Sequence, residues 1–380
     1  MAEEIQGTAA SGKVLVGLSG GVNSAVAAAL LRNQGYDAQG VHFVFRRAKE
    51  SRIADFQSRC CMTSSLAQAK AVAERLEMPF TAIDVEDLFE AEVVDRFVHD
   101  YLEAKKPNPC IPCNSRVKFR VLLDKADAMG IPLVATGHCA QVIRDIQGEG
   151  VRLARAVEAE YDQTYTLCDL TQHELRRVIL PLGGITRTMV TKMAMSLDLD
   201  APGKGASHEM CFVGHPGYWE FIEQRTVDEL RYKGVIRQRE DGTFVGEHAG
   251  LYRFSLGQTR GFQTTLKDRE GLYVVGFDPS ARALLVGKQA ELFQTEFTVA
   301  RMNWIRAVDP IHQVRCLAKI GPAHVPAPCT VFAFENDFVR AKFDQAQWAI
   351  TPGQAVVFYD GEEALGGGTI RSIGVDKAVE

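Results

Sequence analysis

The chain has 380 residues, of which 46% are hydrophobic and 24% charged, and its formal net charge is −5. The length predicts two or three domains, and the composition is typical of soluble globular proteins. The negative charge excludes a global basic field, so a nucleic-acid partner would need local basic patches. No apolar run approaches the roughly 20 residues of a membrane span, and the acidic stretch Met1–Ile5 does not resemble a signal peptide. The sequence therefore predicts a cytoplasmic protein with no membrane partner.

A strand, a glycine turn and a helix are expected near the start of the chain. The apolar run Val14–Val16 precedes Ser19-Gly20-Gly21, and the alanine- and leucine-rich stretch Ala25–Leu31 follows. Glycines let backbone N–H groups approach a ligand closely, and a helix N-terminus carries partial positive charge. The turn therefore predicts an anion site, although neither GxxxxGK[ST] nor GxGxxG is present. An ordinary strand-to-helix turn is the alternative interpretation.

Strands and helices alternate as far as residue 136. After the first strand, the pattern predicts a strand at 37–45, a helix opening at Cys60-Cys61, a strand at 80–85, a helix at 88–104, a loop at 105–109, a helix at 117–129 and a strand at 133–136. This alternation predicts an α/β fold with a doubly wound parallel sheet, whose ligand lies at the carboxyl ends of the strands. The glycine turn and Thr136-Gly137-His138 both fall at such ends.

The pattern of hydrophobic and turn residues changes in the second half of the chain. Residues 171–199 are expected to be helical, and Ala201–Gly205 is a break suited to a domain joint. Beyond about residue 240, short β-rich runs alternate with turns, which predicts an antiparallel β-barrel at the C-terminus. The predicted domains are residues 1–205, a small central domain at 206–275 and the barrel at 276–380.

Nine cysteines in a cytoplasmic chain indicate metal or catalytic use rather than structural disulfides. Cys110 and Cys113 form a C-x-x-C in a proline-rich loop before a helix, with Arg116 and Lys118 close by. Positive charge and a helix N-terminus favour the thiolate, so Cys113 is a candidate reactive thiol. A lone C-x-x-C also fits a redox pair, metal ligands or chance. The third cysteine of interest is Cys211, whose alternative interpretation is a buried apolar residue beside Phe212.

The chain resembles the tRNA-specific 2-thiouridylases (the MnmA family), from about Lys13 to the C-terminus. The glycine turn resembles the pyrophosphatase loop SGGxDS of enzymes that cleave ATP to AMP and pyrophosphate. The other matching segments are Cys60-Cys61, Cys113-Asn114, Lys118-Phe119, Thr136–His138, Asp162–Tyr165, Pro181–Gly183, Ser207–Phe212, Gly246–His248, Gly257-Gln258, Asn303-Trp304, Thr351–Gln354, Phe358–Gly361 and Leu365–Gly368.

The resemblance implies an ATP-dependent tRNA-uridine 2-sulfurtransferase. ATP and Mg²⁺ would adenylate the C2 oxygen of the wobble uridine, uridine 34, in the anticodon stem-loop. The sulfur of a persulfide on Cys211, or cluster-bound sulfide, would then replace it. A sulfur-donor protein or a sulfide source is the partner that this implies. Cys113 would act as the partner thiol that forms a disulfide. Another ATP-pyrophosphatase, such as a ligase for a small carboxylate, is an alternative, but it would need no sulfur relay.

The resemblance also implies binding residues. The expected ATP-binding set is Gly17, Leu18, Ser19, Gly20, Gly21, Val22, Asn23, Ser24, Phe43, Gly137 and His138. The expected tRNA-binding set is Lys118, Asp162, Gln163, Arg253, Gln258 and Arg260. Other basic residues, Lys105 and Lys106 among them, could position tRNA phosphates.

Three residues depart from the family pattern. Asn23 stands where the loop has Asp, Cys110 where an Asp precedes the first cysteine, and Cys139 where a Tyr follows Thr-Gly-His. Asn23 favours a second hypothesis, an ATP-inactive paralogue that binds tRNA or handles sulfur. Cys110, Cys113 and Cys211 together favour a third, a [4Fe–4S] cluster held by three thiolates with one open iron.

Overall fold

The structure is a computed structural model that describes residues 12–46, 63–144, 150–198, 210–213, 217–226, 232–266, 271–306, 313–335 and 338–373. It divides into two compact units: residues 1–92, 110–215 and 362–364 form the first, and residues 93–109, 216–361 and 365–380 form the second. Cys60, Cys61, the break at 201–205 and the start of the Ser207–Phe212 segment lie outside the described residues. In the described part of the chain, no helix is long and apolar enough to cross a membrane.

A five-stranded parallel sheet organises the first unit. Its strands are β1 (Lys13–Gly17), β2 (Asp37–Val44), β3 (Phe80–Asp84), β4 (Leu133–Ala135) and β7 (Val178–Ile179), and their order in the sheet is β3-β2-β1-β4-β7. All the pairings are parallel. The order changes direction at β1, as in a doubly wound sheet, so the predicted fold class is confirmed.

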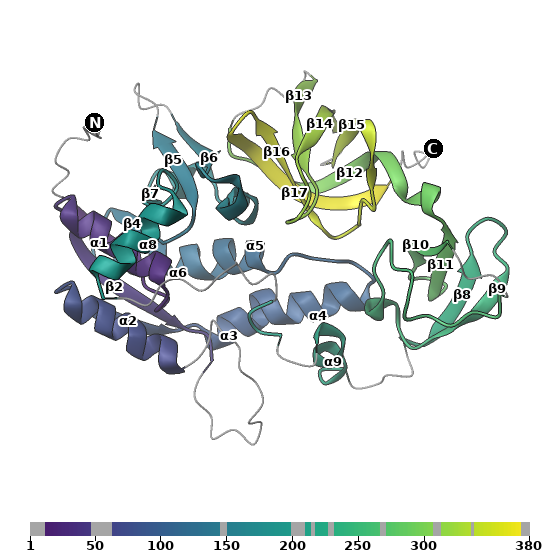
Figure 1. Cartoon of the computed structure of the whole chain (residues 1–380), viewed down its shortest axis with the longest axis horizontal. Coiled ribbons are helices and arrows are strands. Elements are labelled where there is room, and N and C mark those ends of the chain that lie inside the picture. The colour runs from purple at the N-terminus through teal and green to yellow at the C-terminus, as the bar shows by residue number, and fades with distance from the viewer. Residues whose placement is uncertain are drawn as a thin grey trace. The chain divides into compact units, whose positions relative to one another are not determined.

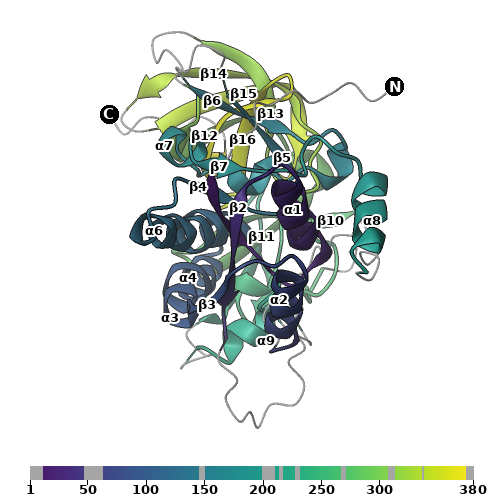
Figure 2. The same cartoon turned by 90° about the vertical axis from the view of Figure 1, so that its left-hand side faces the viewer.

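Helices cover both faces of this sheet. α1 (Val22–Asn33) and α2 (Thr63–Arg75) lie on one face and α6 (Arg120–Ala128) on the other (Figure 2). Val14 and Val16 of β1 share a core with Ala25, Ala28 and Leu31 of α1. Successive side chains of a strand point to opposite faces, so the fully apolar run of β1 is what a strand buried on both sides requires.

The helices around the C-x-x-C begin earlier than predicted. α5 (Cys110–Pro112), η2 (Cys113–Phe119, a π-helix) and α6 follow one another without a break, so Cys110 and Cys113 lie in the first turns of a helix rather than in a loop before it. Pro112 is tolerated there because the first turn needs no backbone N–H donor. The predicted helix at 88–104 is confirmed as α3 (Glu86–Phe89), η1 (Glu90–Val94, also π) and α4 (Asp95–Leu102).

The predicted continuous helix at 171–199 is wrong. It is replaced by α7 (Gln172–Leu175), the edge strand β7 and α8 (Arg187–Ser196). The β-branched pair Val178-Ile179 aligns with Val134 and Ala135 of β4, and Pro181 cannot continue a helix. Sequence analysis also missed the hairpin formed by β5 (Ala140–Arg144) and β6 (Val151–Arg155). Two 3₁₀ turns, η3 (Ala159–Tyr161) and η4 (Thr164–Leu167), complete the described elements of this unit.

The second unit contains two β structures. β8 (Gly234–Gln238), β9 (Phe244–His248), β10 (Leu272–Asp278) and β11 (Ala283–Lys288) form a four-stranded sheet. β12 (Phe293–Trp304), β13 (Val314–Lys319), β14 (Ala327–Glu335), β15 (Phe338–Trp348), β16 (Ala355–Asp360) and β17 (Glu363–Ile373) follow (Figure 1). Pairing of β12 with β17 closes these six strands into the predicted antiparallel barrel. α9 (Tyr218–Glu223), η6 (Leu251–Arg253) and η7 (Gln289–Leu292) complete this unit's described elements.

One lysine of the second unit is buried. The side chain of Lys106 is 6% exposed, and its Nζ donates to the carbonyl oxygen of Tyr252 at 3.1 Å. Nζ also lies 4.3 Å from the ring centroid of Tyr101 and 5.6 Å from that of Tyr218. Burial disfavours the ammonium form and lowers the pKa of Lys106 to about 7. Lys106 therefore does not belong to the surface cations that were expected to position tRNA phosphates.

We expect Lys106→Met to stabilise the protein near pH 6 and to lose most of that advantage near pH 10. The pKa of Lys106 is about 7 when folded and 10.5 when unfolded. The unfolded state binds more protons between these values, so wild-type stability rises with pH in that window. The pKa shift corresponds to a gain in the free energy of unfolding of up to about 5 kcal/mol when the lysine is replaced. The loss of the hydrogen bond to Tyr252 and of the ring contacts reduces this gain. Thermal melts across this pH range would check it, with the exposed Lys105→Met as control. A variant less stable than wild type near pH 6 would contradict it.

Candidate functional site

The glycine turn between β1 and α1 is held by its two serines. The backbone N–H of Ser19 donates to Ser24 Oγ at 3.1 Å, the two hydroxyl oxygens are also 3.1 Å apart, and the N–H of Gly21 donates to Ser19 Oγ at 3.2 Å. Gly20 has φ +81°, and a Cβ there would lie 2.4 Å from the carbonyl oxygen of Ser65 in α2. Only glycine fits this backbone.

The start of α1 presents open backbone donors. Gly21 is its N-cap and has no side chain with which to cap the first turn. Among the described residues, no acceptor lies within hydrogen-bonding reach of the N–H groups of Val22 and Asn23. These donors, with the partial positive charge of the helix end, fit an anionic group. Leu18 contributes differently, because its side chain is buried and its backbone N–H and C=O bond to Val41 and His42.

The end of β4 packs directly on this loop. A Cβ added to Gly137 would lie 2.6 Å from the backbone nitrogen of Ser24 and 2.7 Å from the carbonyl carbon of Asn23. One added to Gly17, at the end of β1, would contact the Thr136 side chain at 3.6 Å. The structure thus brings together two sequence segments that were predicted separately as ATP-binding.

His138 is held in place by its neighbours. Its Nδ1 is 2.8 Å from Thr136 Oγ1, and its ring stacks on Phe119 with centroids 5.7 Å apart. Burial, followed by the positive charge of Lys118, lowers the pKa of His138 to about 3. The imidazole is therefore neutral at physiological pH and cannot serve there as a cationic phosphate ligand.

Asn23 lies among residues that sequence analysis did not connect. Its Oδ1 accepts a hydrogen bond from Arg187 Nη1 at 2.8 Å, and its Nδ2 points to Cys139 Sγ at 3.8 Å. Two departures from the family pattern, Asn23 and Cys139, are therefore neighbours. Arg187 was missed altogether; the available signal was a basic residue following Thr186, the N-cap of α8.

Aromatic rings connect Cys211 to the carboxyl end of β2. Phe43 of β2 contacts Phe45 (centroids 6.2 Å apart), Phe45 contacts Phe89 of α3 (5.0 Å), and Phe89 contacts Phe212 (5.8 Å). Phe212 is 1% exposed, whereas its neighbour Cys211 is half-buried. These contacts anchor the Cys211 segment at the sheet edge where the glycine loop also lies.

The other two cysteines differ in exposure. Cys113 is buried and Cys110 is exposed, and Arg116 in the same π-helix forms an ion pair with Glu92 at 3.3 Å. No group of three His, Cys, Asp or Glu side chains within the described ranges, which include all three cysteines, lies in a metal-binding arrangement. The arrangement of Cys110, Cys113 and Cys211 in this structure does not fit a [4Fe–4S] ligand set.

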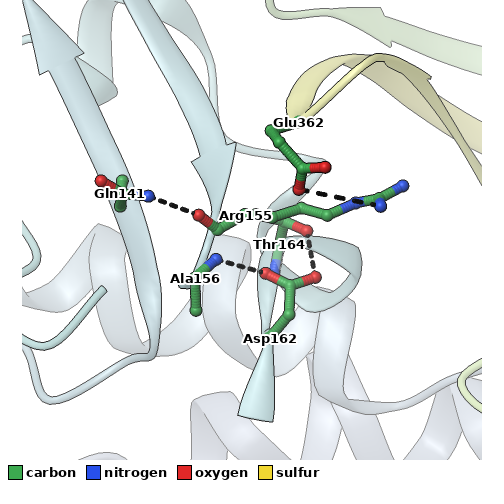
Figure 3. Close-up of polar contacts among 6 residues, drawn as sticks. All are labelled: Gln141, Arg155, Ala156, Asp162, Thr164 and Glu362. Carbon is green, nitrogen blue, oxygen red and sulfur yellow. Dashed lines mark hydrogen bonds and ion pairs between the residues drawn. The ribbon is translucent and has the colours of Figure 1, made fainter. Parts of the chain in front are cut away.

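The expected tRNA-binding residues of the first unit all have intramolecular partners (Figure 3 shows those of Asp162). Asp162 Oδ1 accepts from the N–H groups of Ala156 (3.1 Å) and Thr164 (3.3 Å), and Oδ2 accepts from Thr164 Oγ1 (2.6 Å). Gln163 Oε1 accepts from the N–H of Cys139 at 2.8 Å. Lys118 Nζ donates to Asn114 Oδ1 at 3.0 Å. Asp162 therefore has a structural role, and its contact with tRNA stays a prediction.

The remaining three lie in the second unit. Arg253 Nε donates to Glu223 Oε1 at 2.9 Å, and its guanidinium lies 4.5 Å from the ring centroid of Trp219. Gln258 Oε1 accepts from the N–H of Ser255 at 3.0 Å, and Arg260 is exposed. Glu223 and Trp219 were not predicted, because nothing in the sequence pairs α9 with residues 30 positions further along.

Models of known protein families match almost the whole chain. Family models match residues 12–215 (tRNA methyl transferase HUP domain), 219–288 (tRNA methyl transferase PRC-barrel domain) and 294–370 (aminomethyltransferase beta-barrel domain). The predicted domain boundaries at 205/206 and 275/276 stay predictions.

Two curated relatives match the chain over almost its whole length. The tRNA-specific 2-thiouridylase MnmA of Acetivibrio thermocellus is 36% identical over 94% of this chain and 99% of its own length, and that of Geobacter metallireducens is 38% identical over 94% and 96%. A solved 4-thiouridine synthetase–RNA complex with bound ATP has a TM-score of only 0.30, with 18% identity over 56% of this chain and 50% of that chain. On the sequence matches, the chain belongs to the family of the tRNA-specific 2-thiouridylases.

Proposed function

We propose that the protein is an ATP-dependent tRNA 2-thiouridylase. The observation that carries the proposal is identity of 36–38% over 94% of the chain to relatives named tRNA-specific 2-thiouridylase. The substrates would be ATP and a tRNA whose wobble uridine enters the site at the carboxyl edge of the first unit's sheet. A cytoplasmic location and a donor of sulfur at the oxidation level of a persulfide, such as a sulfur-donor protein, belong to the same proposal.

The glycine loop would bind the phosphates of ATP. Its support is the open N–H groups at the start of α1 and the close contact of Gly137 with Asn23 and Ser24. Ser19 and Ser24 keep the loop in shape, and Gly17 and Phe43 line the same edge. When bound, Mg²⁺ would neutralise charge on the departing pyrophosphate; the carbonyl oxygen of Asn23 and the hydroxyls of Ser19 and Ser24 are oxygen ligands of the type it accepts.

The chemistry would proceed in two steps. The C2 oxygen of the uridine attacks the α-phosphorus of ATP and releases pyrophosphate, so that this oxygen can later leave as part of AMP. The terminal sulfur of a Cys211 persulfide then attacks C2 and AMP leaves, which joins Cys211 to the base through two sulfurs. The Cys113 thiolate attacks the Cys211 sulfur, forming the Cys113–Cys211 disulfide and releasing 2-thiouridine. Two electrons from a thiol reductant restore the dithiol.

We favour this persulfide route over cluster-bound sulfide. The arrangement of the described cysteines offers no three-thiolate ligand set, whereas the half-buried Cys211 at the sheet edge suits sulfur delivery to a bound base. The proposal requires that the sulfur atoms of Cys113 and Cys211 come close enough to form a disulfide.

Asn23 supports a second candidate function, that of an ATP-inactive paralogue. Its amide lacks the charge with which an aspartate would help place a metal ion. Such a protein would bind tRNA or carry sulfur without turning over ATP.

Anaerobic thiolation of a tRNA transcript with ATP, Mg²⁺ and polysulfide, with 2-thiouridine read by mass spectrometry, tests the proposal. Polysulfide carries sulfur at the oxidation level of a persulfide, so it can load Cys211 without a further oxidant. Wild type should form 2-thiouridine, tRNA should stimulate pyrophosphate release, and Cys110→Ala should remain active, since Cys110 is exposed and has no step in the persulfide route. Activity in Asn23→Asp alone would identify the paralogue. Pyrophosphate release independent of tRNA would instead indicate a ligase.

A further inference from the structure

Two cysteines of the C-terminal barrel face each other across neighbouring strands. In the antiparallel pairing of β13 with β14, Cys316 is directly opposite Cys329. Side chains of opposite residues lie on the same face of a sheet, and their Cα atoms are about 4.5–5.5 Å apart. A disulfide bond requires a Cα separation of about 4.4–6.8 Å. The barrel backbone therefore holds the pair at the spacing of a disulfide, while both cysteines are free thiols.

The adjacent residue pair fixes this register. Arg315 and Thr330 are also opposite each other, and Arg315 Nη1 donates to Thr330 Oγ1 at 2.8 Å and to Asp344 Oδ1 of β15 at 2.7 Å. Successive side chains of a strand point to opposite faces, so the cysteines point away from this exposed cluster. Cys329 belongs to the barrel core, and Cys316 packs against it. The contacts of Arg315 thus oppose a slip of the strands that would separate the two thiols.

The two thiols contact each other and differ in exposure. Cys329 is 0% exposed, whereas Cys316 is half-buried. A hydrogen bond with the Cys329 thiol, followed by burial, raises the pKa of Cys316. A thiol attacks other sulfur atoms as the thiolate, so exchange at this pair is slow at neutral pH. The arrangement combines one cysteine that a reagent can approach with an enclosed one that can then attack it.

We propose that Cys316 and Cys329 are a redox-active dithiol that is oxidised by small-molecule disulfides and closes into a cross-strand disulfide in the folded barrel. The Cys316 thiolate attacks one sulfur of the small disulfide, which forms a mixed disulfide and releases one small thiolate. The Cys329 thiolate then attacks the Cys316 sulfur and releases the second. The protein loses two electrons and two protons, and the small disulfide gains them as it becomes two thiols.

This inference goes beyond the proposed function, because it involves neither ATP nor tRNA and leaves the roles of Cys113 and Cys211 unchanged. Disulfides in cytoplasmic proteins are usually transient and serve catalysis or redox sensing. The new bond would tie β13 to β14 and restrict their separation in the unfolded chain. The barrel would thereby become more stable under oxidising conditions.

Incubation of the folded full chain with oxidised glutathione, followed by blocking of free thiols, tryptic digestion and mass spectrometry, tests the proposal. Trypsin separates the two cysteines, so the disulfide should join peptide 316–319 to peptide 320–340. Most of both peptides should be found in this linked form, and dithiothreitol should abolish it. Cys329→Ala should instead carry glutathione on Cys316, at least about tenfold more than wild type, because the mixed disulfide has no second thiol to resolve it.

The internal control is Cys168 of the first unit, which is 1% exposed and should stay reduced. Cys316→Ser should leave Cys329 reduced, and thermal melts identify any variant that fails to fold. Wild type in which both barrel cysteines stay reduced after prolonged exposure overturns the inference. So does oxidation of Cys168 to the same extent, which would show that unfolding had exposed the thiols. Either result leaves the proposed function standing, since that function is tested by thiolation of tRNA.

Discussion

Cys211→Ser is expected to abolish 2-thiouridine formation, by at least about 10³-fold, while tRNA-stimulated pyrophosphate release stays within about threefold of wild type. A serine hydroxyl cannot carry the persulfide sulfur, but the adenylation step does not use this side chain. The proposed phosphate loop is built from residues 17–24 and Gly137, whereas the ring contacts of the Cys211 segment run from Phe212 through Phe89 to Phe45. Separate assays of pyrophosphate and of 2-thiouridine under single-turnover conditions would measure both effects.

Cys113→Ser is the companion variant, and it distinguishes the roles of the two cysteines. Without the partner thiol, the reaction should stop with tRNA joined to Cys211 through two sulfurs. This adduct should appear on a non-reducing gel and disappear with dithiothreitol. Cys316→Ser serves as control, because Cys316 lies in the barrel strand β13. An adduct that forms in Cys211→Ser and not in Cys113→Ser would reverse the assignment.

Gly137→Ala is expected to weaken ATP binding at least about 100-fold, the equivalent of about 2.7 kcal/mol, and to lower the melting temperature by several degrees. The new Cβ would lie 2.6 Å from the Ser24 nitrogen and 2.7 Å from the Asn23 carbonyl carbon. Both are backbone atoms, so the start of α1 must shift and its N–H groups lose their alignment. Overpacking of this kind costs about 1–3 kcal/mol of stability.

Gly184→Ala provides the matched control in the same unit. A Cβ there meets no atom within 4 Å, so both its ATP affinity and its melting temperature should stay close to wild type. Calorimetric titration with ATP and thermal melts of the three proteins would measure the effect. Wild-type ATP affinity in Gly137→Ala would contradict the placement of the phosphates at this loop.

Local pattern was sufficient for much of the fold. Strand β1, the glycine turn and α1 follow from an apolar run, two glycines and an alanine-rich stretch, all of which are short-range signals. The pattern failed at Val178-Ile179, because two β-branched residues between helical segments become a strand only through pairing with Val134 and Ala135. It also placed Cys110 and Cys113 in a loop, since prolines in a first helical turn resemble loop prolines.

The sequence by itself determined the α/β class, the C-terminal barrel, the family resemblance and the residue types of the candidate site, because these depend on periodicity and on short motifs. Only the tertiary structure decided which residues meet. Arg187 lies 164 positions from Asn23 and Cys139 lies 116 positions from it, yet both contact its amide. Lys106 reads as a surface cation in sequence but is enclosed by Tyr101, Tyr218 and Tyr252. Burial and long-range contact arise when distant elements pack together, and no local pattern encodes them.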